Sequence, residues 1–454
     1  MAKSIVCIVL VFLNFAAACQ ENWKNQAIIY GAVAQVWGDD GFKTVDSKLE
    51  YIKDLGVDVV WLWPPVCKRA QGEEYGIVDY FSIDPSWGSR AELRGLVRHA
   101  HRLGLRVMID FVPNHTSDKH PFYLDTRKKG RASRYYDYYD REPNGAPKYY
   151  FDYANLPNLN YDNECVRRMM INAIGYWIRE YDIDGYRMDM AWAVQERCPD
   201  FWVECRKELK RIKPDLLLLA EASAEDANLF NCRFDVAYDW RGGPGKWAWE
   251  GAFEDQNTIG ERMESILATD TKSYSRQARV LRFINNNDTG ERYITRYGLG
   301  TTKVAAAMEF TLPGVSLIFG GDEIGAQYEP YSDLPPVLSG DKYNLRKWYK
   351  QLIRIRDGSA AIRCGDLVML KSEPKSVVSY IRTAGKCSVI VVLNYGKACK
   401  AKIELSEFDG PFATSGIAQD MLDGKNVFGI SGNCTVLPMD SNSVRILVPS
   451  PAGN

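Results

Sequence analysis

The sequence predicts an α/β protein whose main domain is a (β/α)8 barrel. Eight short apolar runs, each typical of a buried parallel strand, alternate with helical patterns along the chain. No glycine-rich nucleotide-binding fingerprint accompanies these runs, so a closed barrel is favoured over the alternative, a doubly wound open sheet. Beyond Arg363 the pattern changes to short alternating runs separated by Gly, Asn and Asp turns, which indicates a small antiparallel β domain.

The first predicted strands are nearly continuous apolar runs, as expected for strands that are covered on both sides. The run from Val57 to Trp63 is nearly all apolar and ends at Pro64 and Pro65. The eight predicted strands cover residues 28–37, 57–63, 105–112, 185–190, 216–222, 235–240, 280–285 and 315–320.

Helices are predicted between the strands from apolar residues three and four apart. The first pattern begins at Val45 and stops at Gly56. In the next helix Ser89 and Glu92 form a capping box, and Gly104 closes the apolar stripe. Two further helical patterns cover residues 166–178 and 199–212.

A long irregular segment interrupts this alternation between residues 113 and 163. It is rich in Tyr, Asp, Arg, Lys and Pro and has no apolar period. Insertions of this length in compact folds usually serve function, here as a lid or a wall of a cleft. We therefore predict a barrel over residues 19–362 with an inserted loop-rich subdomain at about 113–163, and a C-terminal β-sandwich domain over residues 363–454.

Residues 1–18 resemble an export signal. Lys3 precedes an apolar run over residues 5–15 that is too short to span a bilayer comfortably, and Ala16, Ala17 and Ala18 lead to Cys19. Small residues before a cysteine are typical of a bacterial lipoprotein signal, in which Cys19 becomes the lipidated first residue. Ordinary cleavage after Ala18 is the alternative. The prediction is an exported cell-surface or periplasmic lipoprotein, otherwise a secreted protein, with membrane contact only through the lipid anchor.

Composition limits the chemistry that the chain can perform. A net charge of −1 without a Lys/Arg block makes nucleic acid and acidic membrane surfaces poor partners. The chain has only four histidines, two of them in one helical pattern, so acid chemistry must rest on carboxylates. The cysteines show no close-spaced ligand pairs, which favours scattered thiols over a metal centre. The oligomeric state is not indicated.

Two carboxylates follow neighbouring predicted strands in chemically useful positions. Arg187 and Asp189 are two residues apart, so they leave a strand on one face, and the guanidinium should keep Asp189 ionised. Glu221 follows the apolar run 216–220, so its carboxyl should be partly desolvated and its pKa raised, as a general acid requires. For Arg187 and Asp189 alone, a structural ion pair is the common alternative.

Further polar residues follow the other predicted strands. In a barrel, the active site lies at the carboxyl ends of the strands, so these residues are expected on one rim. The full set is Asp110, Asn114 and His115, Arg187 and Asp189, Glu221, Asn286 and Asp288, and Asp322 and Glu323.

Together these stretches resemble the α-amylase family of retaining glycoside hydrolases. The resemblance covers nearly the whole predicted mature chain and depends on an ordered set of motifs rather than on one. Four of its signatures are matched by residues 110–115, 185–189, 219–221 and 283–288, and a fifth by residues 156–160. Tyr75, in the stretch 75–80, is similar to the tyrosine that stacks under the reacting sugar in that family.

The resemblance implies an enzyme that cleaves starch-type α-glucans or malto-oligosaccharides. Asp189 would be the nucleophile, Glu221 the general acid and base, and Asp288 the carboxylate that binds and distorts the sugar. His115 and Arg187 would orient the ring and the nucleophile. No cofactor is required by this mechanism.

Three positions depart from the family pattern or leave it open. Asn287 stands where the family has His, and Trp192 lies where Lys-His follows the second signature, so Trp192 would stack on the sugar beyond the cleavage point. Asn114 resembles a calcium ligand, yet no dense Asp/Asn loop accompanies it, so calcium is an open expectation. The alternatives to hydrolysis are a transglycosylase of the same family and a surface glucan-binding protein without catalysis.

Overall fold

The computed structural model describes residues 23–275, 277–332, 340–405, 412, 416–430 and 434–450. The predicted signal over residues 1–18 and the predicted lipidation site Cys19 lie outside these residues. Within the described part, no helix combines the length and the apolar character that a membrane crossing needs. By their internal contacts the described residues form two compact units, residues 28–244 and the remaining described residues.

Eight strands close into a parallel barrel in the order β1-β12-β11-β10-β9-β8-β5-β2. Seven lie inside their predicted ranges and are shorter than predicted, and β9 is displaced by one residue beyond the predicted range 216–222. Their bounds are β1 Ile28–Val33, β2 Val59–Trp63, β5 Arg106–Phe111, β8 Gly185–Met188, β9 Leu217–Ser223, β10 Val236–Tyr238, β11 Val280–Arg282 and β12 Val315–Phe319. The predicted closed barrel is therefore confirmed, and the open-sheet alternative is wrong.

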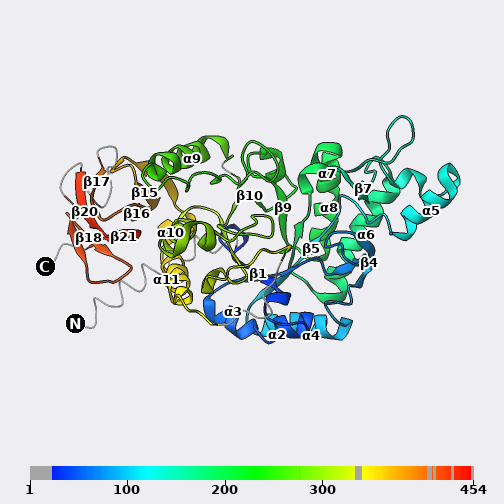
Figure 1. The fold of residues 1–454 in the computed structure, drawn as a ribbon, viewed down its shortest axis with the longest axis horizontal. Coiled ribbons are helices and arrows are strands. Elements are labelled where there is room, and N and C mark those ends of the chain that lie inside the picture. Colours follow the sequence, from blue (N-terminus) through cyan, green and yellow to red (C-terminus); the bar gives the residue numbers. More distant parts are fainter. Residues whose placement is uncertain are drawn as a thin grey trace. The chain divides into compact units, whose positions relative to one another are not determined.

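The first unit carries six of these strands with helices packed outside them (Figure 1). The helices are α2 Gly41–Asp46, α3 Leu49–Leu55, α4 Arg90–Arg102, α6 Glu164–Tyr181, α7 Ala191–Arg197 and α8 Pro199–Ile212. Helix α4 begins with the predicted capping box of Ser89 and Glu92. The single helix expected to start at Val45 is instead two helices, the second of which ends at Gly56 with a left-handed φ of 105°.

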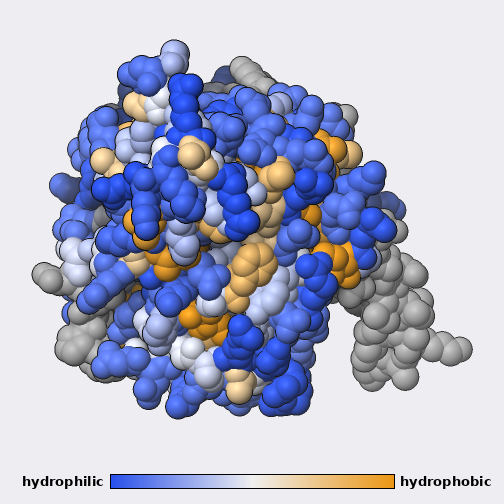
Figure 2. Space-filling view, turned by 90° about the vertical axis from the view of Figure 1, so that its right-hand side faces the viewer, coloured by the Kyte–Doolittle hydropathy of each residue, from blue (hydrophilic) through white to orange (hydrophobic). Residues whose placement is uncertain are grey.

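The inserted segment follows β5 and contains little regular structure. It holds helix α5 Pro121–Lys129 and a two-stranded sheet of β6 Tyr149–Tyr150 and β7 Tyr153–Pro157. The face of the molecule at the α5 and β7 end is mostly hydrophilic, with small groups of apolar residues between (Figure 2). The aromatic residues Phe151 and Tyr153, 64% and 57% exposed, belong to this segment.

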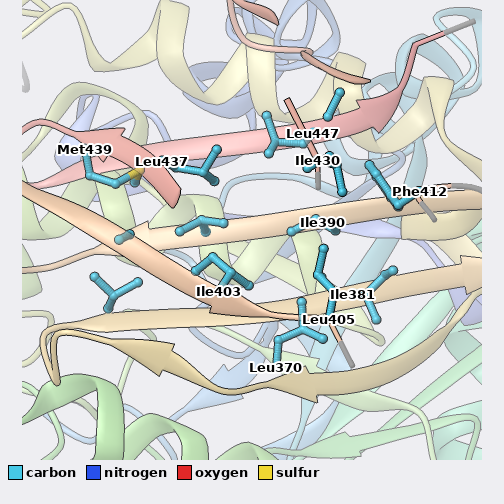
Figure 3. Close-up of a cluster of buried hydrophobic side chains, with 14 residues drawn as sticks. Leu370, Ile381, Ile390, Ile403, Leu405, Phe412, Ile430, Leu437, Met439 and Leu447 are labelled. Atoms are coloured by element: carbon cyan, nitrogen blue, oxygen red, sulfur yellow. The ribbon is translucent and has the colours of Figure 1, made fainter. Parts of the chain in front are cut away.

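The second unit joins β11 and β12 to the C-terminal sheets. Its helices are α9 Ile259–Ser273, α10 Tyr293–Thr311, α11 Leu345–Gly358 and α12 Ala360–Cys364. Beyond them lie an antiparallel six-stranded sheet that begins at Asp366 in β13 (Asp366–Leu370) and a three-stranded sheet. Side chains from both sheets, including Ile381, Ile390, Ile403 and Leu437, form one buried core (Figure 3). The predicted C-terminal antiparallel β domain is confirmed.

Candidate active site

Arg187 lies at the centre of the candidate site and is fully buried on β8. Its Nη1 donates to Asp110 Oδ1 at 3.1 Å and to Asp189 Oδ1 at 2.8 Å, and its Nη2 lies 2.6 Å from Glu221 Oε1. These residues come together because β5, β8 and β9 are parallel neighbours, with Asp110 beside Arg187 and Arg187 beside Leu219 in register. One guanidinium thus holds three carboxyl groups from three strand ends.

One carboxylate oxygen of Asp189 accepts a hydrogen bond, and the other accepts none from the described residues. Its backbone N–H donates to the Phe111 carbonyl at 2.8 Å, and Oδ1 accepts from Arg187. Oδ2 is buried and has no hydrogen-bond partner in the described part of the chain. This second oxygen is therefore available to a ligand.

Glu221 is held by the backbone that follows β8. Its Oε2 accepts the N–H of Met190 at 2.6 Å. Met190 has a left-handed φ of 50°, which is uncommon for a residue with a side chain and turns this N–H toward the carboxyl. Glu221 itself is nearly buried, with 5% of its surface exposed.

The expected electrostatics of Asp189 are corrected by the structure. Burial raises the pKa of the Asp189 carboxyl well above its usual range, the charge of Glu221 raises it further, and Arg187 opposes both only in part. We had expected Arg187 to dominate and to keep Asp189 ionised. With three carboxyl groups on one guanidinium, burial and the charge of Glu221 outweigh the single positive charge beside Asp189.

Tyr75 is fixed by hydrogen bonds on two sides. Its hydroxyl donates to Asp110 Oδ2 at 2.9 Å and accepts from Trp63 Nε1 at 2.9 Å. Tyr238 at the end of β10 accepts from Arg187 Nε at 3.2 Å. Trp63 and Tyr238 were not predicted as site residues, although each ends a barrel strand, and that position is the signal that could have identified them.

His115 is buried beside the same group of residues. Burial lowers the pKa of His115 to about 3, the Tyr75 backbone opposes this, and the charge of Arg197 lowers it further. The neutral ring accepts from Asn114 Nδ2 through Nδ1 at 3.2 Å, so Nε2 carries the proton. Nε2 is buried and makes no hydrogen bond of normal geometry within the described residues, and the ring stacks on Tyr150 at a centroid distance of 5.2 Å.

Trp192 lies on α7 next to an exposed aromatic residue of the inserted segment. The ring centroids of Trp192 and Phe151 are 6.1 Å apart. Phe151 adjoins Tyr150, at a centroid distance of 4.7 Å, and Tyr150 stacks on Tyr153 at 5.6 Å. Aromatic faces therefore continue from His115 through Tyr150 and Phe151 to Trp192.

Asp288 and Asn287 belong to the second unit. The buried Asn287 donates through Nδ2 to the Tyr331 hydroxyl at 2.9 Å, which donates to Asp288 Oδ1 at 3.1 Å. Tyr331 was missed because it follows β12 in an irregular segment without a motif. The role of Asp288 at the sugar stays a prediction.

Both carboxylate oxygens of Asp322, in the turn that follows β12, accept hydrogen bonds. Its carboxyl accepts from Arg292 Nη2 at 2.7 Å, from Asn285 Nδ2 at 2.6 Å and from the Phe319 backbone at 2.9 Å. Every one of these donors belongs to the second unit, and they occupy both oxygens. The position of Asp322 after a strand is thus explained by packing at this turn.

Asn114, the predicted calcium ligand, has its side-chain oxygen engaged by a cation of the chain itself. Asn114 Oδ1 accepts a hydrogen bond from Arg197 Nη2. The described residues contain no group of three or more His, Cys, Asp or Glu side chains arranged to hold a metal ion. As arranged, these residues do not fit a calcium ion at Asn114.

Comparison with known proteins gives one consistent family. A family model described as the catalytic domain of alpha amylase matches residues 30–149 and 144–334. The chain is 29% identical over 442 residues to α-amylase MalA of Haloarcula japonica, which covers 93% of this chain and 63% of that protein. It is 30% identical over 371 residues to a cyclomaltodextrinase of a Bacillus species, covering 78% and 65%.

The intracellular maltogenic amylase of Bacillus subtilis is 31% identical over 403 residues, covering 84% of this chain and 67% of that protein. The chain thus spans about two thirds of the length of these curated relatives. Among solved structures, the maltogenic α-amylase AmyB of Thermotoga neapolitana has a TM-score of 0.78 at 23% identity, covering 94% and 99% of the two chains. At this identity the likeness shows the fold.

Proposed function

The chain belongs to the α-amylase family, and we propose that it hydrolyses α-glucosidic bonds in starch-type glucans or malto-oligosaccharides. The observation that carries the proposal is the pair Asp189 and Glu221 on the guanidinium of Arg187. Retaining glycosidases hold their two carboxyl groups about 5 Å apart, and two carboxyls that share one guanidinium are compatible with that spacing.

In the proposed mechanism Asp189 Oδ2 attacks the anomeric carbon. As this bond forms, the bond from the anomeric carbon to the leaving oxygen breaks, and that oxygen takes the proton of Glu221. The Glu221 carboxylate then removes a proton from water, whose oxygen displaces Asp189 from the sugar. The unbonded oxygen of Asp189 supplies the nucleophile of the first step.

Substitution of the two carboxyls tests the proposal. Asp189→Asn and Glu221→Gln should each lower kcat on soluble starch and maltoheptaose, the latter by about 100- to 10,000-fold. Glu208→Gln on the exposed side of α8 is the matched control and should leave kcat unchanged. Undiminished turnover by both active-site variants would refute the proposal, as would tight glucan binding without turnover by the wild-type protein.

Transfer to a sugar acceptor is the second candidate function. The contact between Phe151 and Trp192 favours it, because exposed aromatic faces next to the site suit an acceptor sugar better than water. Product analysis on maltoheptaose separates the two reactions. Oligomers longer than the substrate that appear early indicate transfer, and shorter products alone indicate hydrolysis.

Export through the N-terminal segment is part of the same proposal. The support is the charge, apolar run and small residues before Cys19. Mass spectrometry of the mature N-terminus tests it, with the Cys19→Ala variant as the control. A diacylated Cys19 supports the lipoprotein, an N-terminus at Cys19 without acyl chains supports ordinary secretion, and an intact Met1 contradicts export.

A further inference from the structure

Arg197 is the last residue of α7, and its guanidinium contacts oxygen atoms from three other segments of its unit. Nη1 donates to the Asp140 carboxylate and, at 2.8 Å, to the Leu159 carbonyl. Nη2 donates to Asn114 Oδ1, and Nε donates to the carbonyl of Ala193 one turn earlier in α7 at 3.1 Å. Three of these oxygens belong to the inserted segment or to its junction with β5.

This set of oxygens is of the kind that normally surrounds a metal ion. A carboxylate, a side-chain amide oxygen and a backbone carbonyl are the ligands that calcium prefers in proteins. A guanidinium presents its N–H donors in a planar fork and remains charged at any accessible pH. It can therefore satisfy the same oxygens with a positive charge that is part of the chain.

Electrostatics favour a cation at this place. Burial raises the pKa of Asp140, and the charge and hydrogen bond of Arg197 oppose that rise. Without Arg197 the partly buried Asp140 carboxylate would lose this ion pair, and the Asn114 side-chain oxygen and the Leu159 carbonyl would lose a hydrogen-bond donor. Removal of one partner from such a group is costly because the other partner stays desolvated.

The same residues reach the candidate active site. Asn114, held through its oxygen by Arg197, uses Nδ2 to contact His115 Nδ1 at 3.2 Å and Asn158 Oδ1 at 3.1 Å. Asn158 Nδ2 in turn donates to the Tyr149 carbonyl at 3.0 Å. Arg197 thus connects α7 and the inserted segment to the residue before His115.

We infer that the Arg197 guanidinium serves as the built-in cation of this junction, so that the chain holds its inserted segment against the barrel without calcium. The inference does not depend on the proposed activity, because it concerns stability and metal content. A consequence is that removing the Arg197 side chain leaves the oxygens of Asp140, Leu159 and Asn114 free to bind a hard cation.

The experiment compares wild-type protein with Arg197→Ala, Arg197→Lys and the control Arg211→Ala. Arg211 is an exposed arginine of the neighbouring helix α8, paired only at the surface with Glu208. Thermal unfolding is followed after dialysis against EDTA and again with millimolar CaCl2, and the metal content of wild-type protein purified without chelator is measured directly.

The wild-type midpoint should not change between EDTA and CaCl2, and the purified protein should contain no stoichiometric calcium. Arg197→Ala should lose several degrees, Arg197→Lys fewer, and CaCl2 should restore part of the loss in Arg197→Ala. A wild-type midpoint that rises with CaCl2, or stoichiometric calcium in the wild-type protein, overturns the inference. So does an Arg197→Ala midpoint equal to that of Arg211→Ala. If Arg197→Ala does not fold, the inference is still tested by the calcium content and midpoints of the wild-type protein and by the midpoint of Arg197→Lys.

Discussion

Asp110, Asp189 and Glu221 share one buried guanidinium, so at the scale of single residues the site carries more negative than positive charge. Burial and the charge of Glu221 therefore outweigh Arg187 and raise the pKa of the Asp189 carboxyl. The proposed mechanism needs Asp189 ionised, so the raised pKa of this carboxyl works against the nucleophile at low pH.

The raised pKa of Asp189 predicts the acidic limb of the pH profile. Asp189 must be ionised to attack, so kcat/KM should fall as the pH falls through the raised pKa, above the range of an ordinary aspartate. Glu221→Gln removes the neighbouring charge and should move this limb to lower pH. The measurement uses an aryl glucoside whose leaving group needs no proton. A limb that stays in place or moves to higher pH in Glu221→Gln would contradict the coupling.

Glu309 on α10 is a buried carboxyl of the second unit. Neither of its oxygens has a hydrogen-bond partner of normal geometry in the described part of the chain. Burial raises the pKa of Glu309 well above its usual value, Asp322 adds to this, and the Leu317 backbone and Arg356 oppose it in part. The folded protein therefore holds a proton that the unfolded chain releases above about pH 4.3.

Glu309→Gln should consequently stabilise the protein at neutral pH. In the wild type the free energy of unfolding falls as the pH rises from the unfolded pKa toward the raised folded pKa. The amide removes this loss, so the variant should gain on the order of 1–3 kcal/mol at neutral pH and little below pH 4. Denaturant unfolding at several pH values measures this, with Glu208→Gln as the exposed control. A gain that does not depend on pH would point to packing instead.

At the scale of elements, apolar runs predicted the strands well because burial on both faces leaves a signal inside each run. Helix α7 was not predicted. It has seven residues, and it begins after Met190, whose left-handed φ ends the strand at Met188 rather than at Met190 as expected. A positive φ at a residue other than glycine leaves no pattern in the sequence. Helix α7 carries both Trp192 and Arg197. Without this helix, neither the position of Trp192 beside Phe151 nor the contacts of Arg197 could be predicted from the sequence.

The motifs predicted which residues of the first unit come together, because parallel strands bring their carboxyl ends to one rim. Asp110, Arg187, Asp189 and Glu221 do lie in contact. Trp63, Tyr238 and Arg197 were missed because their contacts cross large sequence separations and depend on side-chain direction. The direction of the Asp189 pKa shift was also missed, since it follows from burial that only the structure gives.

We predict a binding site for the sugar beyond the cleavage point where Phe151, between β6 and β7, lies beside Trp192 on α7. Phe151→Ala and Trp192→Ala each remove one aromatic partner, at a cost of about 0.5–1.5 kcal/mol per stacking contact. Each variant should raise KM for maltoheptaose by roughly two- to tenfold and lower the share of transfer products. Phe81→Ala, an exposed phenylalanine that contacts Tyr176 away from α7, is the matched control. Unchanged KM and product ratios in both variants would remove the acceptor role.

At the scale of the whole molecule, the C-terminal sheets share a compact unit with barrel strands β11 and β12 and helix α10. Arg382 in β15 (Val377–Ala384) is buried and donates to the carbonyl of Thr311 at the end of α10, and to that of Gly365 at 2.7 Å. The Tyr395 ring lies 5.7 Å from the Phe253 ring, and its hydroxyl contacts Met308 Sδ at 3.6 Å. Buried polar and aromatic contacts of this kind are typical of one core rather than of two modules joined by a linker.

This sharing predicts that the C-terminal sheets cannot be removed without loss of the barrel fold. A chain that ends after Arg363 would expose the buried face of α10 and leave the Thr311 carbonyl unpaired, so it should aggregate on expression. Arg382→Ala tests the same contacts within the full chain and should lower the free energy of unfolding by about 2–5 kcal/mol, because the buried Thr311 carbonyl and the partly buried Gly365 carbonyl lose their donor. Arg363→Ala, at the junction but only partly buried, controls for the loss of an arginine. The measurements are soluble yield and denaturant unfolding. A shortened chain that unfolds cooperatively and hydrolyses maltoheptaose would show that the sheets are a separable module. An Arg382→Ala variant as stable as Arg363→Ala would show that the contact through Thr311 contributes little to the joint core.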